Sequence, residues 1–476
     1  MRILFLSHDF LPLHGAGTEI YSGHLARRLR ARGHDVRVFT TEKDISRVHL
    51  SLDRREWEGV PVFELVNNHF YEGFEQTWDW PPARAALAQV LDEFQPDIVH
   101  AMHLLYLSVG CIEEAAQRGL PVFFTLHDFW LQCARFGQRI HADGEVCQTI
   151  DHARCGSCLV SLKYSQSRAQ ERVAKWIAGL RRKTGVNLAG AVLGTQKLAK
   201  RSAGQGGGGC DFVPPTPEQA KDMQVLAQHR DAGLKARLLP LVERFFAPSR
   251  FLRERFLEWG IEPERIEHLM YGLELEPFAN FQRIPSERFR VTYIGTLAPH
   301  KAPHILLEAW GKLPAELKRK ARLCVYGPKR HNPDYIEKLE GLAQEVGAEL
   351  PGELARADLC QAFEDTDLLV VTSIWFENSP LTIHEALATR TPLLVSDLGG
   401  MAELVEPERH GLRFRPGDSA DLAIQLERFL SDPEFVRSLD FGDSESSGEG
   451  TGPVKSMERS ALEMEQRYTQ ALGERS

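Results

Sequence analysis

Two glutamates, Glu377 and Glu385, stand on either side of a predicted helix start. The surrounding residues 372–397, TSIWFENSPLTIHEALATRTPLLVSD, predict a strand, a loop, a helix and a second strand. Ser379 is expected to cap the free amides of the helix, and Pro380 suits the first helical position. We therefore expect the helix to begin at about Pro380, between the two carboxylates.

The start of this predicted helix has the chemistry of an anion-binding site. Free amides near residues 379–381, at the positive end of the helix dipole, can hold a diphosphate. Glu385 lies about one and a half turns further along, where its carboxylate can accept hydrogen bonds from both hydroxyls of a ribose. Glu377, in the preceding loop, can reach a sugar joined to the diphosphate. The segment predicts a binding site for a sugar nucleotide.

Alternating strands and helices must position these residues. The chain has 476 residues, more than one hydrophobic core usually organises, so we expect two domains. The alternation predicts two doubly wound parallel sheets, whose ligands bind in the crevice outside the carboxyl ends of the strands. The strands are predicted at Arg2–Ser7, Asp35–Thr40, Asp97–Ala101, Pro121–Leu126, Arg244–Ala247, Arg290–Gly295, Ala321–Tyr326 and Leu368–Thr372.

The predicted domain organisation follows these patterns. A glycine run at 206–209 predicts a flexible surface loop. The acidic stretch after Leu439 has too little apolar surface to order itself, and a last helix is expected to pack back on the first domain. The domains are predicted at 1–280, 288–438 and 456–476, with a cysteine-rich insert at 133–158 and a basic helical segment at 163–201.

Composition and charge exclude several classes of protein. Hydrophobic residues make up 43% and charged residues 26% of the chain, and no stretch approaches the roughly 18 apolar residues that span a bilayer. The formal net charge of -9 argues against a general nucleic-acid binder. Because the N-terminus reads as a first strand rather than an export signal, we expect the eight cysteines to face a reducing cytoplasm.

Residues 372–397 resemble the signature of the family 4 retaining glycosyltransferases of the GT-B fold. Further stretches similar to this family follow in the expected order from Met1 to about residue 430. They are HGAGTEIYSGHLARRLRARGHDV, TLHDFW, APSRF with a later YG, YIGTLAPHKAPHILLEAW, VYGP and DLGGMAELVEPERHG. The resemblance implies two Rossmann-like domains facing a cleft, the first for the acceptor and the second for the nucleotide sugar.

The resemblance also implies roles for individual residues of the second half. Glu385 is implied to bind the nucleotide ribose, and Glu377 to touch the donor sugar. Lys301 is implied to neutralise the diphosphate, whose charge must be stabilised as the glycosidic bond breaks. The donor-binding residues implied in the helix-start segment are Asn378, Ser379, Pro380, Leu381 and Glu385.

In the first half, His127 resembles the family histidine beside the donor sugar. Gly15 and Gly17 are implied to let the backbone approach the phosphates and the sugar closely. One position departs from the family pattern, because an arginine often stands where this chain has Thr296. The candidates that replace the missing positive charge are Arg330, His300 and Lys329.

The implied activity is retaining transfer of a sugar from a UDP- or GDP-linked donor to a glycan, a lipid-linked or another hydroxyl acceptor. Cell-surface polysaccharide or glycoconjugate synthesis is the expected setting. The leaving phosphate is expected to take the acceptor proton, so the chemistry requires no metal cofactor. Alternatives on the same architecture are a nucleotide-sugar epimerase, a sugar phosphorylase, and a non-catalytic scaffold that binds a partner through its cysteine-rich module.

Four cysteines cluster in the sequence directly after the TLHDFW stretch. Cys155 and Cys158 form a C-x-x-C pair, the spacing with which two thiolates grip one tetrahedral ion, whereas Cys133 and Cys147 are fourteen positions apart. The cluster predicts a structural zinc site, with free or redox-labile thiols as the alternative. We expect such a metal to have no catalytic role, because four thiolates leave no open position for a substrate.

A second feature, between Lys163 and Arg201, carries ten Lys or Arg residues against one acid, Glu171. Trp176 and aliphatic residues interrupt the charges. A basic helix with an aromatic side chain on its apolar face suits an anionic membrane surface or a lipid diphosphate acceptor, at the inner face of the plasma membrane. The alternative is a solvated helix whose apolar stripe packs on the first domain.

Overall fold

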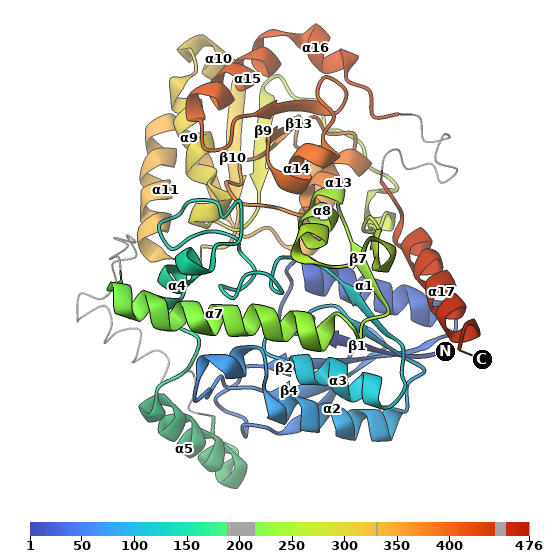
Figure 1. Cartoon of the computed structure of the whole chain (residues 1–476). Coiled ribbons are helices and arrows are strands. Elements are labelled where there is room, and N and C mark those ends of the chain that lie inside the picture. The colour runs from blue at the N-terminus through green and yellow to red at the C-terminus, as the bar shows by residue number, and fades with distance from the viewer. Residues whose placement is uncertain (188–189, 191–214, 330–331, 443–453, 476) are drawn as a thin grey trace.

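The computed structural model of the chain describes residues 1–187, 190, 215–329, 332–442 and 454–475. Two α/β units, each built around one sheet, lie against each other, with the first unit at the bottom of Figure 1 and the second at the top. The glycine run at 206–209, the residues 443–453 of the acidic stretch and Arg330 lie outside the described residues. The two sheets confirm the predicted fold class.

The first sheet has eight strands in the order β3-β4-β2-β1-β5-β6-β7-β8. All neighbours are parallel except β3 and β4, which form an antiparallel hairpin at one edge. The strands are β1 (Arg2–Ser7), β2 (Asp35–Glu42), β3 (Leu52–Trp57), β4 (Val60–Val66), β5 (Ile98–Ala101), β6 (Val122–Thr125), β7 (Arg244–Ala247) and β8 (Ile266–His268).

Helices cover both faces of this sheet, because side chains on a strand alternate in direction. Ile3 and Phe5 of β1 face one apolar cluster, while Leu4 and Leu6 face another on the opposite side. The helices of the first unit are α1 (Gly17–Ala31), α2 (Pro81–Phe94), α3 (Val109–Gln117), α4 (His152–Val160), α5 (Arg168–Thr184), α7 (Pro217–Leu238) and α8 (Arg250–Trp259), with the 3-10 turns η1 (Phe74–Thr77) and η2 (Pro263–Arg265).

The second sheet has six parallel strands in the order β11-β10-β9-β12-β13-β14. They are β9 (Phe289–Ile294), β10 (Ala321–Tyr326), β11 (Glu349–Gly352), β12 (Leu368–Val371), β13 (Leu393–Ser396) and β14 (Gly411–Phe414). The helices and turns are η3 (Glu276–Phe278), η4 (Pro299–Lys301), α9 (Pro303–Lys312), α10 (Ala315–Lys320), α11 (Pro333–Val346), η5 (Arg356–Asp358), α12 (Leu359–Glu364), α13 (Leu381–Ala388), α14 (Gly399–Leu404), α15 (Ser419–Ser431) and α16 (Pro433–Ser438).

The last helix, α17 (Met457–Gly473), returns to the first unit and packs beside α1 (Figure 1). Its buried face includes Met464 and Tyr468, which join the apolar cluster around Phe5. The Tyr468 hydroxyl is also hydrogen-bonded to Nδ1 of the buried His100 on β5. Because α17 follows the second sheet in sequence, this packing ties the end of the chain to the first unit.

The β3–β4 hairpin is an element that the sequence pattern does not predict. β3 has the sequence LDRREW, which is rich in charged residues and lacks the apolar run expected of a buried strand. Charged residues are tolerated here because β3 is an edge strand, and charge on an edge discourages pairing with other chains. None of the hairpin residues lines the cleft between the two units.

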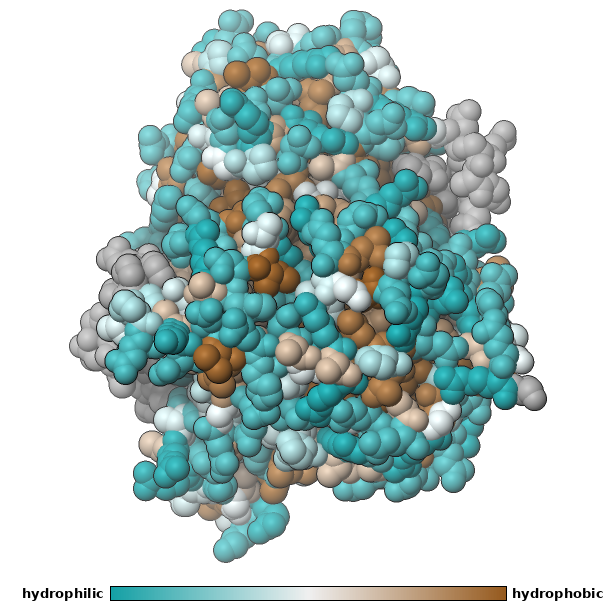
Figure 2. Space-filling view, viewed as in Figure 1, coloured by the Kyte–Doolittle hydropathy of each residue, from teal (hydrophilic) through white to brown (hydrophobic). Residues whose placement is uncertain are grey.

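The polarity of the surface is consistent with burial of the apolar residues inside the two units. The face shown in Figure 2 is mainly hydrophilic, and the hydrophobic side chains on it form small separate groups. Among the described residues, no helix combines the length and the apolar character that crossing a bilayer requires.

Candidate functional site

A cleft of about 460 Å³ lies between the two units, at the carboxyl ends of the strands. The first unit contributes the start of α1 and the loop after β6, and the second contributes the loops after β9 and β12 with the start of α13. The Asn378 side-chain amide donates a 2.8 Å hydrogen bond to the carbonyl of His127, which joins the two walls. Of the residues predicted to bind a sugar nucleotide, all except Gly15 line this cleft.

Glu385 lies on the second turn of α13 and its side chain is buried. Oε1 accepts a hydrogen bond of 2.5 Å from Arg356, whereas Oε2 is buried without a hydrogen-bond partner in the described chain. Burial raises the pKa of Glu385 above its ordinary value, although the Arg356 guanidinium acts in the opposite direction. A buried, unsatisfied carboxylate oxygen in a cleft wall is costly until a hydroxyl donor fills it.

The helix start differs from the sequence prediction in one respect. α13 begins at Leu381, Pro380 occupies the N-cap position, and no side chain caps the helix. The Ser379 hydroxyl is instead hydrogen-bonded to Nε2 of the buried His384 at 2.7 Å. The prediction that Ser379 caps the helix is therefore wrong, because proline fixes the backbone after it and moves the first turn one residue on.

The α13 start nevertheless keeps free donors. In the described part of the chain, the backbone amides of Leu381 and Thr382 make no hydrogen bond to protein. Both residues line the cleft, and the helix dipole places partial positive charge at this end. An anion beside these amides would satisfy them.

Glu377 also lines the cleft, and one of its carboxylate oxygens has three partners. Its Oε1 accepts hydrogen bonds from the Ser373 hydroxyl at 2.8 Å and from the Trp375 indole at 2.7 Å, and it also pairs with the Lys301 ammonium. Burial acts to raise the pKa of Glu377, but the Lys301 charge and these donors outweigh it and hold the pKa below its usual value. Glu377 is therefore ionised at neutral pH.

Lys301 ends the η4 turn just before α9, and its ammonium lies 5.0 Å from the centre of the Trp375 ring. The next residue, Ala302, has a φ of 51°, a left-handed conformation that suits glycine better than alanine. This strained turn directs the start of α9 and leaves Lys301 in the cleft wall. The Lys301 ammonium therefore pairs with Glu377 and also faces the open space of the cleft.

His127 follows β6 and is buried, with its Nδ1 at 2.5 Å from the Tyr271 hydroxyl. Its Nε2 has no hydrogen-bond partner within the described residues. Burial, with a smaller contribution from His103, lowers the pKa of His127 to about 3, so the ring is neutral at pH 7. When Tyr271 donates to Nδ1, the ring proton resides on Nε2 and can be donated to a ligand.

The two glycines of the first loop are placed differently. Gly17 begins α1 and lines the cleft, and a methyl group added there would meet no protein atom within 4 Å. Gly15 does not line the cleft, and an added methyl would meet Leu11 at 3.9 Å. Of the two, only Gly17 leaves room that a ligand could use.

Several side chains that can carry positive charge lie near Thr296 in the structure. Thr296 and His300 line the cleft, whereas Lys329 forms an ion pair of 2.8 Å with Glu340 and is not part of the wall. Arg356, on the η5 turn, also lines the cleft. No sequence signal marks Arg356, because it lies far from the helix-start segment and approaches it only through the order of the strands.

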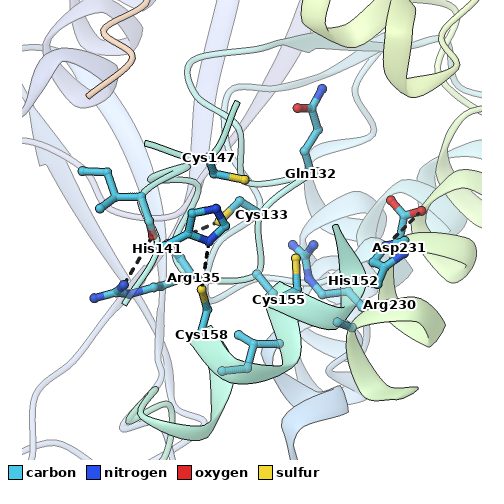
Figure 3. A pocket seen from close by; sticks show the side chains of 14 residues that line it. Gln132, Cys133, Arg135, His141, Cys147, His152, Cys155, Cys158, Arg230 and Asp231 are labelled. Atoms are coloured by element: carbon cyan, nitrogen blue, oxygen red, sulfur yellow. Dashed lines mark hydrogen bonds and ion pairs between the residues drawn. The ribbon is translucent and has the colours of Figure 1, made fainter. Parts of the chain in front are cut away.

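The four clustered cysteines line a second, smaller cavity in the first unit (Figure 3). His141 and His152 line the same cavity. Among the residues that the structure describes, no three potential ligand side chains already surround a common point as a metal site requires. The basic segment forms α5 through Thr184 and extends at the edge of the first unit (Figure 1), while residues 188–189 and 191–201 are not described.

Comparisons with known proteins agree with this geometry. Residues 276–440 match the family "Glycosyl transferases group 1", and residues 16–155 match the "Glycosyl transferase 4-like domain". A D-inositol 3-phosphate glycosyltransferase from a Nocardioides species is 27% identical over 39% of this chain and 45% of its own length. An alpha-D-kanosaminyltransferase from Streptomyces kanamyceticus is 26% identical over 43% of this chain and 50% of its own length. The matches thus span about half the length of these curated relatives.

Solved structures are similar over nearly the whole chain. A sucrose-phosphate synthase from Thermosynechococcus elongatus has a TM-score of 0.63 at 18% identity, covering 99% of both chains. An Anabaena protein crystallised with UDP and glucose has a TM-score of 0.60 at 17% identity, covering 99% of this chain and 100% of its own. At these identities the likeness shows the fold.

Proposed function

Because the chain belongs to the group 1 glycosyltransferases, family 4, with the GT-B fold, we propose that it transfers a sugar from a nucleotide diphosphate donor to a hydroxyl acceptor. The observation that carries the proposal is the bare Oε2 of Glu385, buried beside the free amides of α13 in the cleft. A ribose diol and a diphosphate supply the donors and the acceptors that these groups lack.

The polar groups of the cleft suit the successive parts of such a donor. Glu385 accepts hydrogen bonds from the ribose, and the amides of Leu381 and Thr382 bind the diphosphate. Lys301 and Arg356 add fixed positive charge to the phosphates. Glu377 and His127 lie at the sugar end, in keeping with the roles that the family resemblance implies.

The proposed reaction breaks the bond between the sugar C1 and the diphosphate oxygen. The acceptor oxygen forms a bond to C1 on the same face, and its proton moves to the leaving phosphate, so configuration is retained. Charge that develops on the diphosphate is stabilised by Lys301 and by the α13 amides, which are positioned before the reaction begins. Side-chain and backbone donors supply this stabilisation, so the proposed mechanism requires no metal ion.

The donor base is tested directly by calorimetric titration of the full-length protein with UDP, GDP and their glucose and mannose derivatives. One nucleoside diphosphate is expected to bind, and Glu385→Gln should weaken that binding while Glu427→Gln, an exposed glutamate of the same unit, should not. Absence of binding by every nucleotide would contradict the proposal and favour a scaffold. UDP-glucose and UDP are ligands of solved structural neighbours and are the first probes.

Transfer is distinguished from other activities on this architecture by omitting the acceptor. An epimerase converts the donor sugar without an acceptor, whereas a glycosyltransferase releases at most slow hydrolysis products. A phosphorylase requires inorganic phosphate and forms a sugar phosphate. Product analysis by NMR of the anomeric proton also tests retention, because an inverted linkage would contradict the proposed same-face attack.

For the acceptor, we propose a glycan or lipid-linked hydroxyl used in cell-surface polysaccharide or glycoconjugate synthesis, presented at an anionic membrane surface. α5 supports this choice, because its exposed face combines Trp176, 60% exposed, and Val173, 38% exposed, with basic side chains. The basic residues of α5 are Arg168, Arg172, Lys175, Arg181, Arg182 and Lys183. An anionic surface complements this charge, and the aromatic ring can enter the headgroup region.

Co-sedimentation with vesicles of phosphatidylcholine and phosphatidylglycerol tests the membrane surface. Binding is expected only with the anionic lipid, and removing one basic residue with Arg182→Ala should weaken it about fivefold. Trp176→Ala should also weaken it, whereas Ile424→Ala, an equally exposed apolar residue of the second unit, should not. Equal binding to neutral vesicles would contradict an electrostatic surface.

A further inference from the structure

The four clustered cysteines reach one cavity from three separate segments. Cys133 lies in the loop after β6, and Cys147 follows a small antiparallel bridge between Ile140 and Val146. Cys155 and Cys158 lie one helical turn apart on α4, so their side chains leave the same face of the helix. Figure 3 shows the four cysteines grouped around the space beside His141. The cavity has a volume of about 30 Å³, enough for a single small ion.

The segments that carry these cysteines are held firmly. α4 packs on α7 so closely that a methyl group added to Gly156 would lie 2.1 Å from the carbonyl oxygen of Ala220. The Arg139 guanidinium donates two hydrogen bonds to the Cys147 carbonyl, at 2.7 and 3.0 Å. Arg230 donates to the carbonyls of Trp130 and Leu131, next to the segment of Cys133. The arrangement fixes backbone positions and leaves only the thiols to turn.

Electrostatics supplies an independent observation. Arg139 and Arg230 are both only 3% exposed, and every hydrogen bond found for either guanidinium among the described residues goes to a neutral oxygen. Asp231 lines the cavity, but its carboxylate pairs with Lys235 at 3.0 Å and accepts from Trp259. Arg230 lines the cavity, and Arg139 is hydrogen-bonded to the carbonyl of the cavity residue Cys147. Neither guanidinium is hydrogen-bonded to a carboxylate in the described chain, so an anionic centre in the cavity would complement two buried positive charges.

Free or redox-active thiols do not supply that charge. Cys147 and Cys158 are only 7% and 8% exposed, and a neutral buried thiol carries no charge. Reactive cysteines require a lowered pKa and access to solvent. A bound divalent cation, by contrast, deprotonates its thiol ligands.

We propose that this cavity binds one Zn²⁺ as a tetrahedral tetrathiolate. Its ligands are Cys133, Cys147, Cys155 and Cys158. Four thiolates and one Zn²⁺ carry a net charge of two negative units, which the guanidinium groups of Arg139 and Arg230 neutralise. Tetrahedral sulfur coordination is the geometry that zinc prefers in structural sites.

Binding requires the thiols to turn from their present hydrogen bonds toward the common centre. Cys147 Sγ donates to the carbonyl of Thr149 at 3.2 Å, and Cys158 Sγ lies 3.2 Å from His141 Nδ1. These are the contacts of protonated thiols, and they explain why no ligand set is already assembled. Loss of the proton removes the thiol donor and frees each sulfur to face the metal.

The site would serve the cleft through the segment between its first two ligands. Gly137, between Cys133 and Cys147 in sequence, lines the cleft and has a φ of 72°. A methyl group at Gly137 would lie 2.7 Å from the Trp130 amide nitrogen and 2.8 Å from the Asp128 carboxyl. The metal is therefore structural: it holds the loop that carries Gly137 in the cleft wall, and it offers no open coordination position.

Metal analysis of the purified full-length protein tests the proposal. About one zinc per chain is expected, and Cys155→Ser with Cys158→Ser should lose it. Cys324→Ser, which removes a buried cysteine of the second sheet, should keep it. To separate loss of the ligands from misfolding of the double variant, the wild type is also titrated with a mercurial reagent, which should release the zinc as four thiols react.

A second measurement identifies the ligands without any substitution. Protein prepared with Co²⁺ in place of zinc should show sulfur-to-cobalt charge transfer and the intense visible bands of tetrahedral coordination. Glu385→Gln should lose nucleotide binding and keep its zinc, so failure of the proposed transferase activity leaves this test intact. Absence of metal, an iron–sulfur absorption spectrum, or disulfides among the four cysteines in mass spectrometry would each overturn the proposal.

Discussion

The two ends of the cleft hold the same kind of side chain in opposite states. At the sugar end, Glu377 accepts three hydrogen bonds or ion pairs, and its pKa is held below the usual value. At the ribose end, Glu385 pairs with Arg356 through one oxygen only, and burial raises its pKa. In the described chain both carboxylates are paired through Oε1, but Glu377 has three partners there and Glu385 has one, and the second oxygen of Glu385 is buried without a partner.

This difference indicates which carboxylate contributes to donor affinity and which contributes to the chemical step. A carboxylate that is already paired gains little from a ligand but holds Lys301 in place for the chemical step. A carboxylate with a bare oxygen gains a hydrogen bond when a hydroxyl arrives, so it contributes mainly to affinity. We therefore expect Glu385 to act mainly in donor binding and Glu377 mainly in the chemical step. Substitutions at each end of the site test this division.

The largest effect is expected for Lys301→Ala, which removes the cation nearest the proposed leaving group. The turnover number should fall by about 10²- to 10³-fold, because a preorganised electrostatic donor acts chiefly on the transition state. Steady-state kinetics with a cognate donor measures kcat and KM separately. Lys329→Ala, which removes an ion-paired lysine outside the cleft, is the matched control and should be silent. A change in KM with an unchanged kcat would mean that Lys301 contributes to substrate binding rather than to the chemical step.

The next effect is a loss of donor affinity in Glu385→Gln, about tenfold or more. The amide keeps the size of the side chain but no longer offers two ionised oxygens to the ribose. Stability of the ligand-free protein should stay equal or rise at neutral pH. In wild type the folded-state pKa of Glu385 is raised, so its ionisation disfavours the folded state as pH increases through that pKa.

Calorimetry and chemical denaturation of the same samples check both parts of this expectation. Glu427→Gln controls for removal of an exposed charge from the second unit. Destabilisation of the ligand-free protein without loss of donor affinity would mean that Glu385 is a structural residue rather than part of the ribose site.

Glu377→Gln is expected to show the reverse pattern, with its main effect on the stability of the ligand-free protein. It should lower the free energy of unfolding at pH 7 by about 1–3 kcal/mol, because Lys301 loses its buried partner. A carboxylate with a lowered folded-state pKa stabilises the protein above its unfolded pKa, and this contribution is lost as pH falls through the folded pKa. The gap between wild type and variant should thus narrow in acid. A gap that widens as the pH falls would contradict the pairing.

The smallest effect tests the helix start. Ser379→Ala and His384→Ala should each destabilise the protein modestly, and the double variant should be less destabilised than their sum by about 1 kcal/mol, because they share one hydrogen bond. Denaturation of the three variants measures this coupling. Additive effects would restore Ser379 as an independent helix cap.

Much of the fold follows from local pattern. The predicted strands Arg2–Ser7, Arg244–Ala247 and Ala321–Tyr326 coincide with β1, β7 and β10. These are short apolar runs between helices, and a short apolar run of this kind is typical of a parallel strand that is buried on both faces. The hairpin strand β3 escapes prediction because an edge strand satisfies only one side and accepts charged residues.

The candidate site was predictable to a smaller extent. The chain order around Glu377 and Glu385 marks a loop, a helix start and two acids, which is enough to expect a sugar-nucleotide site. The hydrogen-bond partners are a different matter. Ser379 bonds to His384 rather than to the helix amides, and Arg356 reaches Glu385 from the turn after β11. Neither contact leaves a mark in the spacing of residues.

By itself, the sequence determined the alternation of strands and helices, the free helix start after Pro380, and the positions of the two acids and the four cysteines. These depend on neighbours a few residues away, where backbone geometry and periodicity act. Only the tertiary structure decided that Glu377 is paired with Lys301 while one oxygen of Glu385 has no partner, and that the buried Arg230 lines the cysteine cavity. Burial and charge depend on which distant segments the sheets bring together, and they fix the state of each ionisable group.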